Sequence, residues 1–227
     1  MTNFDAIIFD FDGVLIESEF EGNRHLADLL SRLGHPTTVA DAIEHYTGLS
    51  GRDFVSAVEQ RIGRELPREF HQATRSLRDR SLEEGIAAVA GAVQFVRALP
   101  PTLLKAVASS SSTRWVRTHL DHLGLSEAFG PHVYSGAEHV ARGKPEPDLY
   151  LHAARELGVP IERAVILEDS RVGAKGALAS GATVIGIAAG RHCFDGHADM
   201  LRSLGVAYVA HSFEEVARLL ELDQTSK

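Results

Sequence analysis

Short apolar runs that lack polar alternation recur along this chain, and they constrain its fold more than any other feature. A strand with one solvated face alternates apolar and polar residues, whereas a strand buried on both faces reads as a continuous apolar run. The runs occupy residues 6–9, 104–108, 133–134, 164–167 and 183–187. Each of them therefore predicts a strand inside a parallel sheet.

Longer stretches with helical periodicity lie between these runs. They cover residues 92–99, 113–123, 148–157, 172–180 and 214–222. Strands that alternate with helices are typical of a parallel sheet, because each strand must return to the same edge through a crossover. The sequence thus predicts an α/β fold, a Rossmann-like parallel sheet with helices on both faces.

This alternation breaks between residues 16 and 87, where no convincing strand appears. Apolar stripes at helical spacing run through residues 26–33 and 54–62 instead. We therefore expect a small all-helical cap domain, inserted after the first strand.

The expected division places residues 1–15 and 88–227 in the core and residues 16–87 in the cap. The chain would leave the sheet near residues 14–19 and return near residues 84–90. We expect these two crossings to form a hinge.

The charge balance limits the partners of this chain. Its 31 acidic residues exceed its 23 lysines and arginines, which gives a formal net charge of -8. Nucleic acids and anionic membranes are bound through clustered basic residues, so neither is expected as a partner. A small anionic substrate stays compatible with an acidic protein, because a metal and one or two local cations can hold a phosphate.

A single cysteine, Cys193, rules out an internal disulfide and fits a reducing compartment. No uninterrupted apolar stretch approaches membrane-spanning length. We expect a soluble cytoplasmic protein that is a monomer or a weak dimer.

Two carboxylates follow the first apolar run, at Asp10 and Asp12, directly before Gly13. Ligands of open parallel sheets bind beyond the carboxyl ends of the strands, so these acids could face one metal and one substrate. Taken alone, however, the same residues read equally well as a strand-end turn.

Three later segments point to the same edge of the sheet. Ser109 directly follows the second run and begins a run of four serines, residues 109–112, before a helix, as an anion-binding hydroxyl or a simple helix cap would. Lys144 precedes two prolines, Pro145 and Pro147, in a stiff loop before another helix, and could neutralise a phosphoryl oxygen or lie on a surface turn. Glu168 and Asp169 directly follow the fourth run, where adjacent buried carboxylates repel each other unless a cation is present.

Together, the four motifs in this order resemble the haloacid dehalogenase superfamily. The segments are Asp10-Phe11-Asp12-Gly13, Ser109, Lys144-Pro145-Glu146-Pro147-Asp148 and Glu168-Asp169-Ser170. Within the superfamily the chain is most similar to the branch of sugar phosphatases and β-phosphoglucomutase, and the helical insertion looks like its cap. The resemblance covers essentially the whole chain.

The resemblance implies catalytic roles for Asp10, Asp12, Ser109 and Lys144. Asp10 would be the nucleophile that forms an aspartyl-phosphate. Asp12 would protonate the leaving alcohol and then activate water. A carboxylate is a recognised nucleophile for such a covalent step, and the anionic reactants need charge neutralisation.

It also implies a Mg²⁺ site built from oxygen ligands, with Asp10, Asp12, Glu168 and Asp169 as its residues. Asp12 would contribute its backbone carbonyl, Asp169 would bind directly, and Glu168 would support it, for example through water. Oxygen ligands suit Mg²⁺. The twelve histidines are scattered along the chain, so we expect no transition-metal site.

Ser109, Ser110 and Lys144 would hold the phosphate of a small phosphorylated metabolite. In the cap, Gly48 and Arg52 lie in a loop that is similar to a substrate-specificity loop, although a plain helix-helix turn explains the same residues.

Two departures separate this chain from the mutases that it resembles. Gly22 stands where those enzymes have a histidine, and Thr47 stands where they have a lysine. We therefore expect a phosphatase, with a β-phosphoglucomutase-like phosphotransferase as the alternative. A catalytically inactive binding scaffold is a third reading, disfavoured by the complete set of acids.

Overall fold

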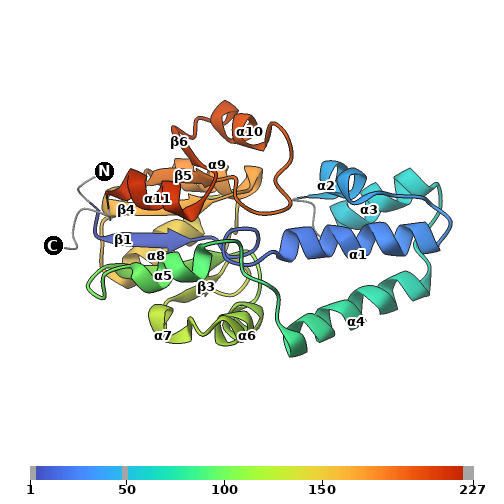
Figure 1. The fold of residues 1–227 in the computed structure, drawn as a ribbon, viewed down its shortest axis with the longest axis horizontal. Helices are drawn as coiled ribbons and strands as arrows, with labels where there is room; N and C mark the ends of the chain where they lie inside the picture. The colour runs from blue at the N-terminus through green and yellow to red at the C-terminus, as the bar shows by residue number, and fades with distance from the viewer. Residues whose placement is uncertain (1–3, 48–50, 222–227) are drawn as a thin grey trace.

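The computed structural model describes residues 4–47 and 51–221, and its centre is a parallel sheet (Figure 1). Six strands are described, in the order β3-β2-β1-β4-β5-β6, and every neighbouring pair is parallel. They are β1 (Ala6–Phe9), β2 (Leu104–Ser109), β3 (Val133–Ser135), β4 (Ala164–Glu168), β5 (Thr183–Ile187) and β6 (Tyr208–Ala210). The predicted α/β fold is confirmed.

The five predicted strands are all present, and β1 and β5 have the predicted bounds. The sequence prediction missed β6, a strand of three residues at the edge of the sheet. Its signal is the apolar run 206–210, in which Ala207 and Tyr208 are exposed and Val209 is half-buried. An edge strand this short gives a weak pattern.

Helices cover both faces of the sheet. One face packs against α5 (Ala92–Ala98), α6 (Thr113–Leu123), α7 (Ser126–Phe129) and α11 (Phe213–Leu220). The other face packs against α8 (Asp148–Leu157), α9 (Arg171–Ser180) and α10 (His197–Ser203). A one-turn 3₁₀ helix, η1 (Ile161–Arg163), leads into β4.

Alternate side chains of β1 reach the two layers. Ile7 and Phe9 enter the apolar cluster of α5, α6, α7 and α11, while Ala6 and Ile8 enter the other. Both layers are fully buried at β1, since all four residues have 0% exposure. This explains why the strand reads as an unbroken apolar run.

Four helices form the insertion between β1 and α5: α1 (Ser18–Arg32), α2 (Val39–Tyr46), α3 (Gly51–Ile62) and α4 (Arg68–Glu84). They extend from one end of the sheet (Figure 1) and have an apolar cluster of their own, centred on Leu26, Leu30, Val58 and Phe70. No strand occurs among the described residues between Ser18 and Glu84. This cluster supports our division into a core and a cap at residues 16 and 87, which stays a proposal.

The two crossings between the sheet and these helices lie side by side. The Glu17 amide donates to the Ala87 carbonyl (2.9 Å), and the Val89 amide donates to the Leu15 carbonyl (3.1 Å). The inserted helices therefore leave and rejoin the sheet at one place.

Among residues 4–47 and 51–221, none of the helices combines the length and the apolar character needed to cross a bilayer.

Candidate active site

Three neighbouring strands bring the predicted site residues to one edge of the sheet. Phe9 is in register with Val107 of β2 and Leu167 of β4. Asp10 directly follows β1, Ser109 ends β2, and Asp169 directly follows β4. Parallel strands end at the same edge, so residues distant in the sequence meet there.

Lys144 occupies the centre of this edge. Its Nζ lies 2.5 Å from Asp10 Oδ1 and 2.8 Å from Glu168 Oε2, and only 4% of its side chain is exposed. Burial alone would lower the pKa of Lys144, but the adjacent carboxylates raise it well above its ordinary value. The ammonium is therefore a permanent positive charge beside the nucleophile candidate.

The carboxylates outnumber this one cation. Oxygen atoms of Asp10, Glu168 and Asp169 lie within 4.8 Å of one another, and all three residues are buried. Burial and then the charge of Glu168 raise the pKa of Asp10 well above its usual range, although Lys144 opposes the shift. Burial also raises the pKa of Asp169. Such crowding favours a second cation.

One carboxylate oxygen marks where that cation fits. Asp169 Oδ1 is buried and has no hydrogen-bond partner among the described residues. A buried carboxylate oxygen without a partner is costly, and an all-oxygen donor set suits a hard divalent ion. Asp10 and Asp169 thus fit a divalent metal.

Glu168 is engaged differently from these two. Its Oε2 accepts from Lys144 and from the Tyr150 hydroxyl (2.6 Å). Its Oε1 accepts from the Asp169 amide (3.1 Å), the Ser170 amide (2.8 Å) and the Ser170 hydroxyl (2.7 Å). Burial would raise the pKa of Glu168, yet Lys144 and these donors lower it. The geometry favours a supporting role that anchors Lys144, in line with the indirect role expected for Glu168.

The Asp12 carboxylate turns toward hydroxyl and indole donors. Its Oδ1 accepts from the Ser18 hydroxyl (2.7 Å) and from Trp115 Nε1 (3.0 Å). Its Oδ2 accepts from the Ser111 hydroxyl (2.7 Å) and more weakly from Ser109 (3.4 Å). The side chain is thereby fixed in a cleft-facing position, from which it could exchange a proton with a bound ester.

A cleft of about 810 Å³ joins these residues to the inserted helices. The sheet side contributes Asp10, Asp12, Lys144 and Asp169, and Ser110 lies exposed on its wall. The helical insertion contributes Glu19, Glu44, Thr47 and Arg78. Of the predicted cap residues, Gly48 lies outside the described residues, as does the side chain of Arg52.

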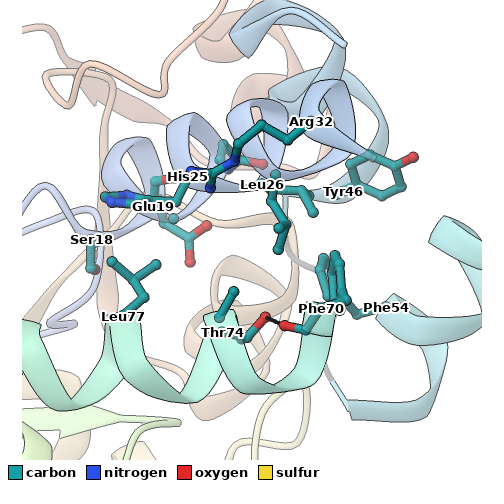
Figure 2. A pocket seen from close by; sticks show the side chains of 14 residues that line it. Ser18, Glu19, His25, Leu26, Arg32, Tyr46, Phe54, Phe70, Thr74 and Leu77 are labelled. Atoms are coloured by element: carbon teal, nitrogen blue, oxygen red, sulfur yellow. Dashed lines mark hydrogen bonds between the residues drawn. The ribbon is translucent and has the colours of Figure 1, made fainter. Parts of the chain in front are cut away.

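A second cavity of about 300 Å³ lies inside the insertion (Figure 2). Leu26 of α1 faces Leu77 and Thr74 of α4 across it (Figure 2). Ser18 and Glu19 line both this cavity and the cleft. Burial, then the charges of Asp169 and Asp12, raise the pKa of Glu19 to about 7.

Several site residues were missed by sequence reasoning. Tyr150, Trp115 and Ser111 donate to the central carboxylates, and His192 Nε2 lies 2.7 Å from Asp169 Oδ2. Ser111 belongs to the run of serines at residues 109–112, but no spacing pattern marks the other three. Their positions depend on how the helices and loops pack.

Comparison with known proteins gives a consistent result. A family model described as haloacid dehalogenase-like hydrolase matches residues 4–181. Hexitol phosphatase A of Escherichia coli (strain K12) is 32% identical over 216 residues, which are 93% of this chain and 92% of that protein. The phosphorylated carbohydrates phosphatase of Thermotoga maritima is 30% identical over 185 residues, 78% of this chain and 82% of that protein.

A solved structure is similar over nearly the whole chain. It is a conserved haloacid dehalogenase-like protein from Agrobacterium tumefaciens str. C58, with a TM-score of 0.87 and 33% identity. The match covers 96% of this chain and 98% of that one.

Proposed function

The chain belongs to the haloacid dehalogenase-like hydrolases, as the four motifs predicted, and we propose that it is a Mg²⁺-dependent phosphatase of a small phosphorylated metabolite. A sugar phosphate is the favoured substrate, in keeping with the printed names of the two relatives. The observation that carries the proposal is the buried Asp10–Lys144–Glu168 cluster beside Asp169, open to a cleft. The net charge of -8 supports a small metabolite over nucleic acid. We place the protein in the cytoplasm as a monomer or weak dimer.

Asp10 is the nucleophile in this proposal. Its carboxylate attacks phosphorus, the ester P–O bond breaks, and Asp12 gives its proton to the departing alcohol. Asp12 then takes a proton from water, which attacks phosphorus and breaks the bond to Asp10, so that inorganic phosphate leaves.

Charge neutralisation comes from the residues around Asp10. Lys144, Ser109 and Ser110 hold the phosphoryl oxygens, while Asp10, Asp169 and the backbone carbonyl of Asp12 hold the metal. Mg²⁺ supplies positive charge against the phosphoryl group when bound. Gly48 and Arg52 contact the leaving group in the proposal, as specificity residues of the cap.

A hydrolysis screen over phosphorylated metabolites, with and without Mg²⁺, tests the activity. Free phosphate released only with Mg²⁺ supports the proposal. Bound Mg²⁺ without turnover of any ester would point to a binding scaffold instead.

Water, rather than a sugar, is expected to accept the phosphoryl group. The mutases that the chain resembles have a histidine and a lysine where this chain has Gly22 and Thr47. Gly22 has no side chain, and the Thr47 hydroxyl accepts a hydrogen bond from Asn23 Nδ2 (3.2 Å). With β-glucose 1-phosphate and a trace of glucose 1,6-bisphosphate, free phosphate should form in excess over glucose 6-phosphate. Measuring both products in one reaction decides the question. Glucose 6-phosphate that appears much faster than phosphate would establish the mutase.

Asp12→Asn should separate proton donation from nucleophilic attack. The amide cannot protonate a poor leaving group, so we expect the rate with a sugar phosphate to fall about 10²- to 10⁴-fold. An aryl phosphate, whose leaving group needs no proton, should lose much less in phosphoryl-enzyme formation. The first turnover of both substrates is followed by rapid quench. Equal losses for the two substrates would remove Asp12 from the acid role.

A further inference from the structure

His192 is the buried partner of the Asp169 carboxylate. Its Nε2 lies 2.7 Å from Asp169 Oδ2, and the two side chains are 0% and 3% exposed. The neighbouring His197, at the start of α10, places its Nε2 2.8 Å from the Asp169 backbone oxygen. The segment after β5 therefore holds this acid at both its side chain and its backbone.

Two glycines form the walls of the slot that contains the His192 ring. A Cβ at Gly190 would lie 2.6 Å from both Cε1 and Nδ1 of the ring, closer than packed atoms approach. A Cβ at Gly13 would lie 3.0 Å from Cε1 and would also collide with Asp169 Oδ2. The ring is thus confined by backbone on two sides, so its position is set by the fold.

The two carboxylate oxygens of Asp169 have different surroundings. Oδ2 meets His192, whereas Oδ1 is buried with no hydrogen-bond partner among the described residues. A hydrogen bond to one oxygen of a ligating carboxylate fixes the direction of the other. We infer that His192 is a positioning residue, which turns Asp169 so that Oδ1 faces the metal. This inference rests on the metal site of the proposed function.

A soft-metal site made by the histidines themselves is the competing reading. Ligand atoms of His192, Cys193 and His197 lie within 4.8 Å of one another, and nitrogen and sulfur donors suit Zn²⁺. However, the Nε2 atoms of both histidines already contact Asp169. A bound Zn²⁺ would have to break one of these contacts, or rely on Nδ1 of a ring whose Nδ1 faces Gly190. The arrangement therefore favours a support for Asp169.

A matched pair of amide variants tests the inference. In His192→Gln, the amide nitrogen can reach about the place of Nε2, whereas the shorter side chain of His192→Asn cannot. Binding is measured by titrating Mn²⁺, counting the free ion by electron paramagnetic resonance, and displacing it with Mg²⁺. We expect His192→Asn to bind about 10- to 100-fold more weakly than the wild type, and His192→Gln to recover most of the affinity.

Two further measurements separate positioning from folding. Thermal unfolding without metal shows whether a variant is folded, and a positioning role predicts that His192→Asn regains most of its turnover at saturating Mg²⁺. If both variants bind Mn²⁺ as the wild type does, or if both lose affinity equally while folded, the inference is wrong. If His192→Asn does not fold, His192→Leu replaces it in the comparison. Wild-type Mn²⁺ affinity in His192→Leu would contradict the inference, and a loss of affinity that His192→Gln restores would support the inference.

Other results separate this inference from the function on which it rests. If the wild type binds Zn²⁺ stoichiometrically and Cys193→Ser abolishes this binding, the soft-metal site would replace the positioning role of His192. A wild type that hydrolyses esters but binds no Mn²⁺ or Mg²⁺ would remove the metal site and this inference together. Bound Mn²⁺ without hydrolysis would contradict the proposed phosphatase, while the comparison of the His192 variants would still hold.

Discussion

Asp10→Asn should abolish hydrolysis and leave a protein at least as stable as the wild type. The amide keeps the shape of the side chain but is a very poor nucleophile, so we expect turnover to fall at least about 10⁴-fold. The gain in stability follows from the crowding at the sheet edge. Burial and the charge of Glu168 raise the pKa of Asp10, so its charge is unfavourable in the metal-free fold.

Stability and activity of this variant must be measured separately. Thermal unfolding is compared without metal at neutral pH. A carboxyl group whose pKa is raised in the folded state contributes stability at low pH, and this stability is lost as the pH rises to neutrality. Hydrolysis is measured at saturating Mg²⁺. Retained turnover would exclude Asp10 as the nucleophile. A large drop in the unfolding temperature would instead show that the Asp10–Lys144 ion pair outweighs the repulsion between the acids.

Lys144→Met should impair both properties. Methionine has a similar length and no charge, so Glu168 and Asp10 lose the cation that lies between them. Removing one partner of a buried ion pair costs about 3–5 kcal/mol of stability. We also expect turnover to fall at least about 10³-fold, because a full charge beside the transferring phosphoryl group is lost.

The pH dependence of this loss gives a sharper test. In the wild type, Lys144 and neighbouring donors lower the pKa of Glu168, which contributes stability that is lost as the pH falls through the folded-state value. Without Lys144, burial raises the carboxylate pKa values, so the variant should lose stability as the pH rises. The difference from the wild type should therefore be largest at neutral pH and shrink toward about pH 4.

Denaturant unfolding at several pH values measures this difference. The matched control is Lys175→Met, on the helix α9 but outside the cleft lining. A destabilisation of Lys144→Met that does not change with pH would show that the loss comes from packing, not from charge.

The sheet and the edge residues were predictable because their signals are local. Asp10, Ser109, Lys144 and Asp169 each follow or end an apolar run or precede a helix, and parallel strands necessarily collect such residues at one edge. The structure places the four around one cleft. Their chemical roles stay predictions until the variants above are measured.

The supporting contacts were not predictable in the same way. Trp115 reaches Asp12 across 103 positions of the sequence, and Tyr150 reaches Glu168 across 18. Each is one side chain on an amphipathic helix, where an aromatic residue usually signals core packing. Only the packing of the two helices against the sheet shows which polar atoms the Trp115 ring nitrogen and the Tyr150 hydroxyl contact.

The paired crossings at Leu15–Val89 and Glu17–Ala87 have a consequence for how such a protein can diversify. Because both ends of the insertion meet at one point, its helices can be lengthened, shortened or exchanged without pulling the strands out of register. The free energy needed to close a changed insertion is small, since the spacing of its two ends is already set by backbone hydrogen bonds. Selection on the insertion can thus act on one segment of the gene while the residues at the edge of the sheet are inherited unchanged.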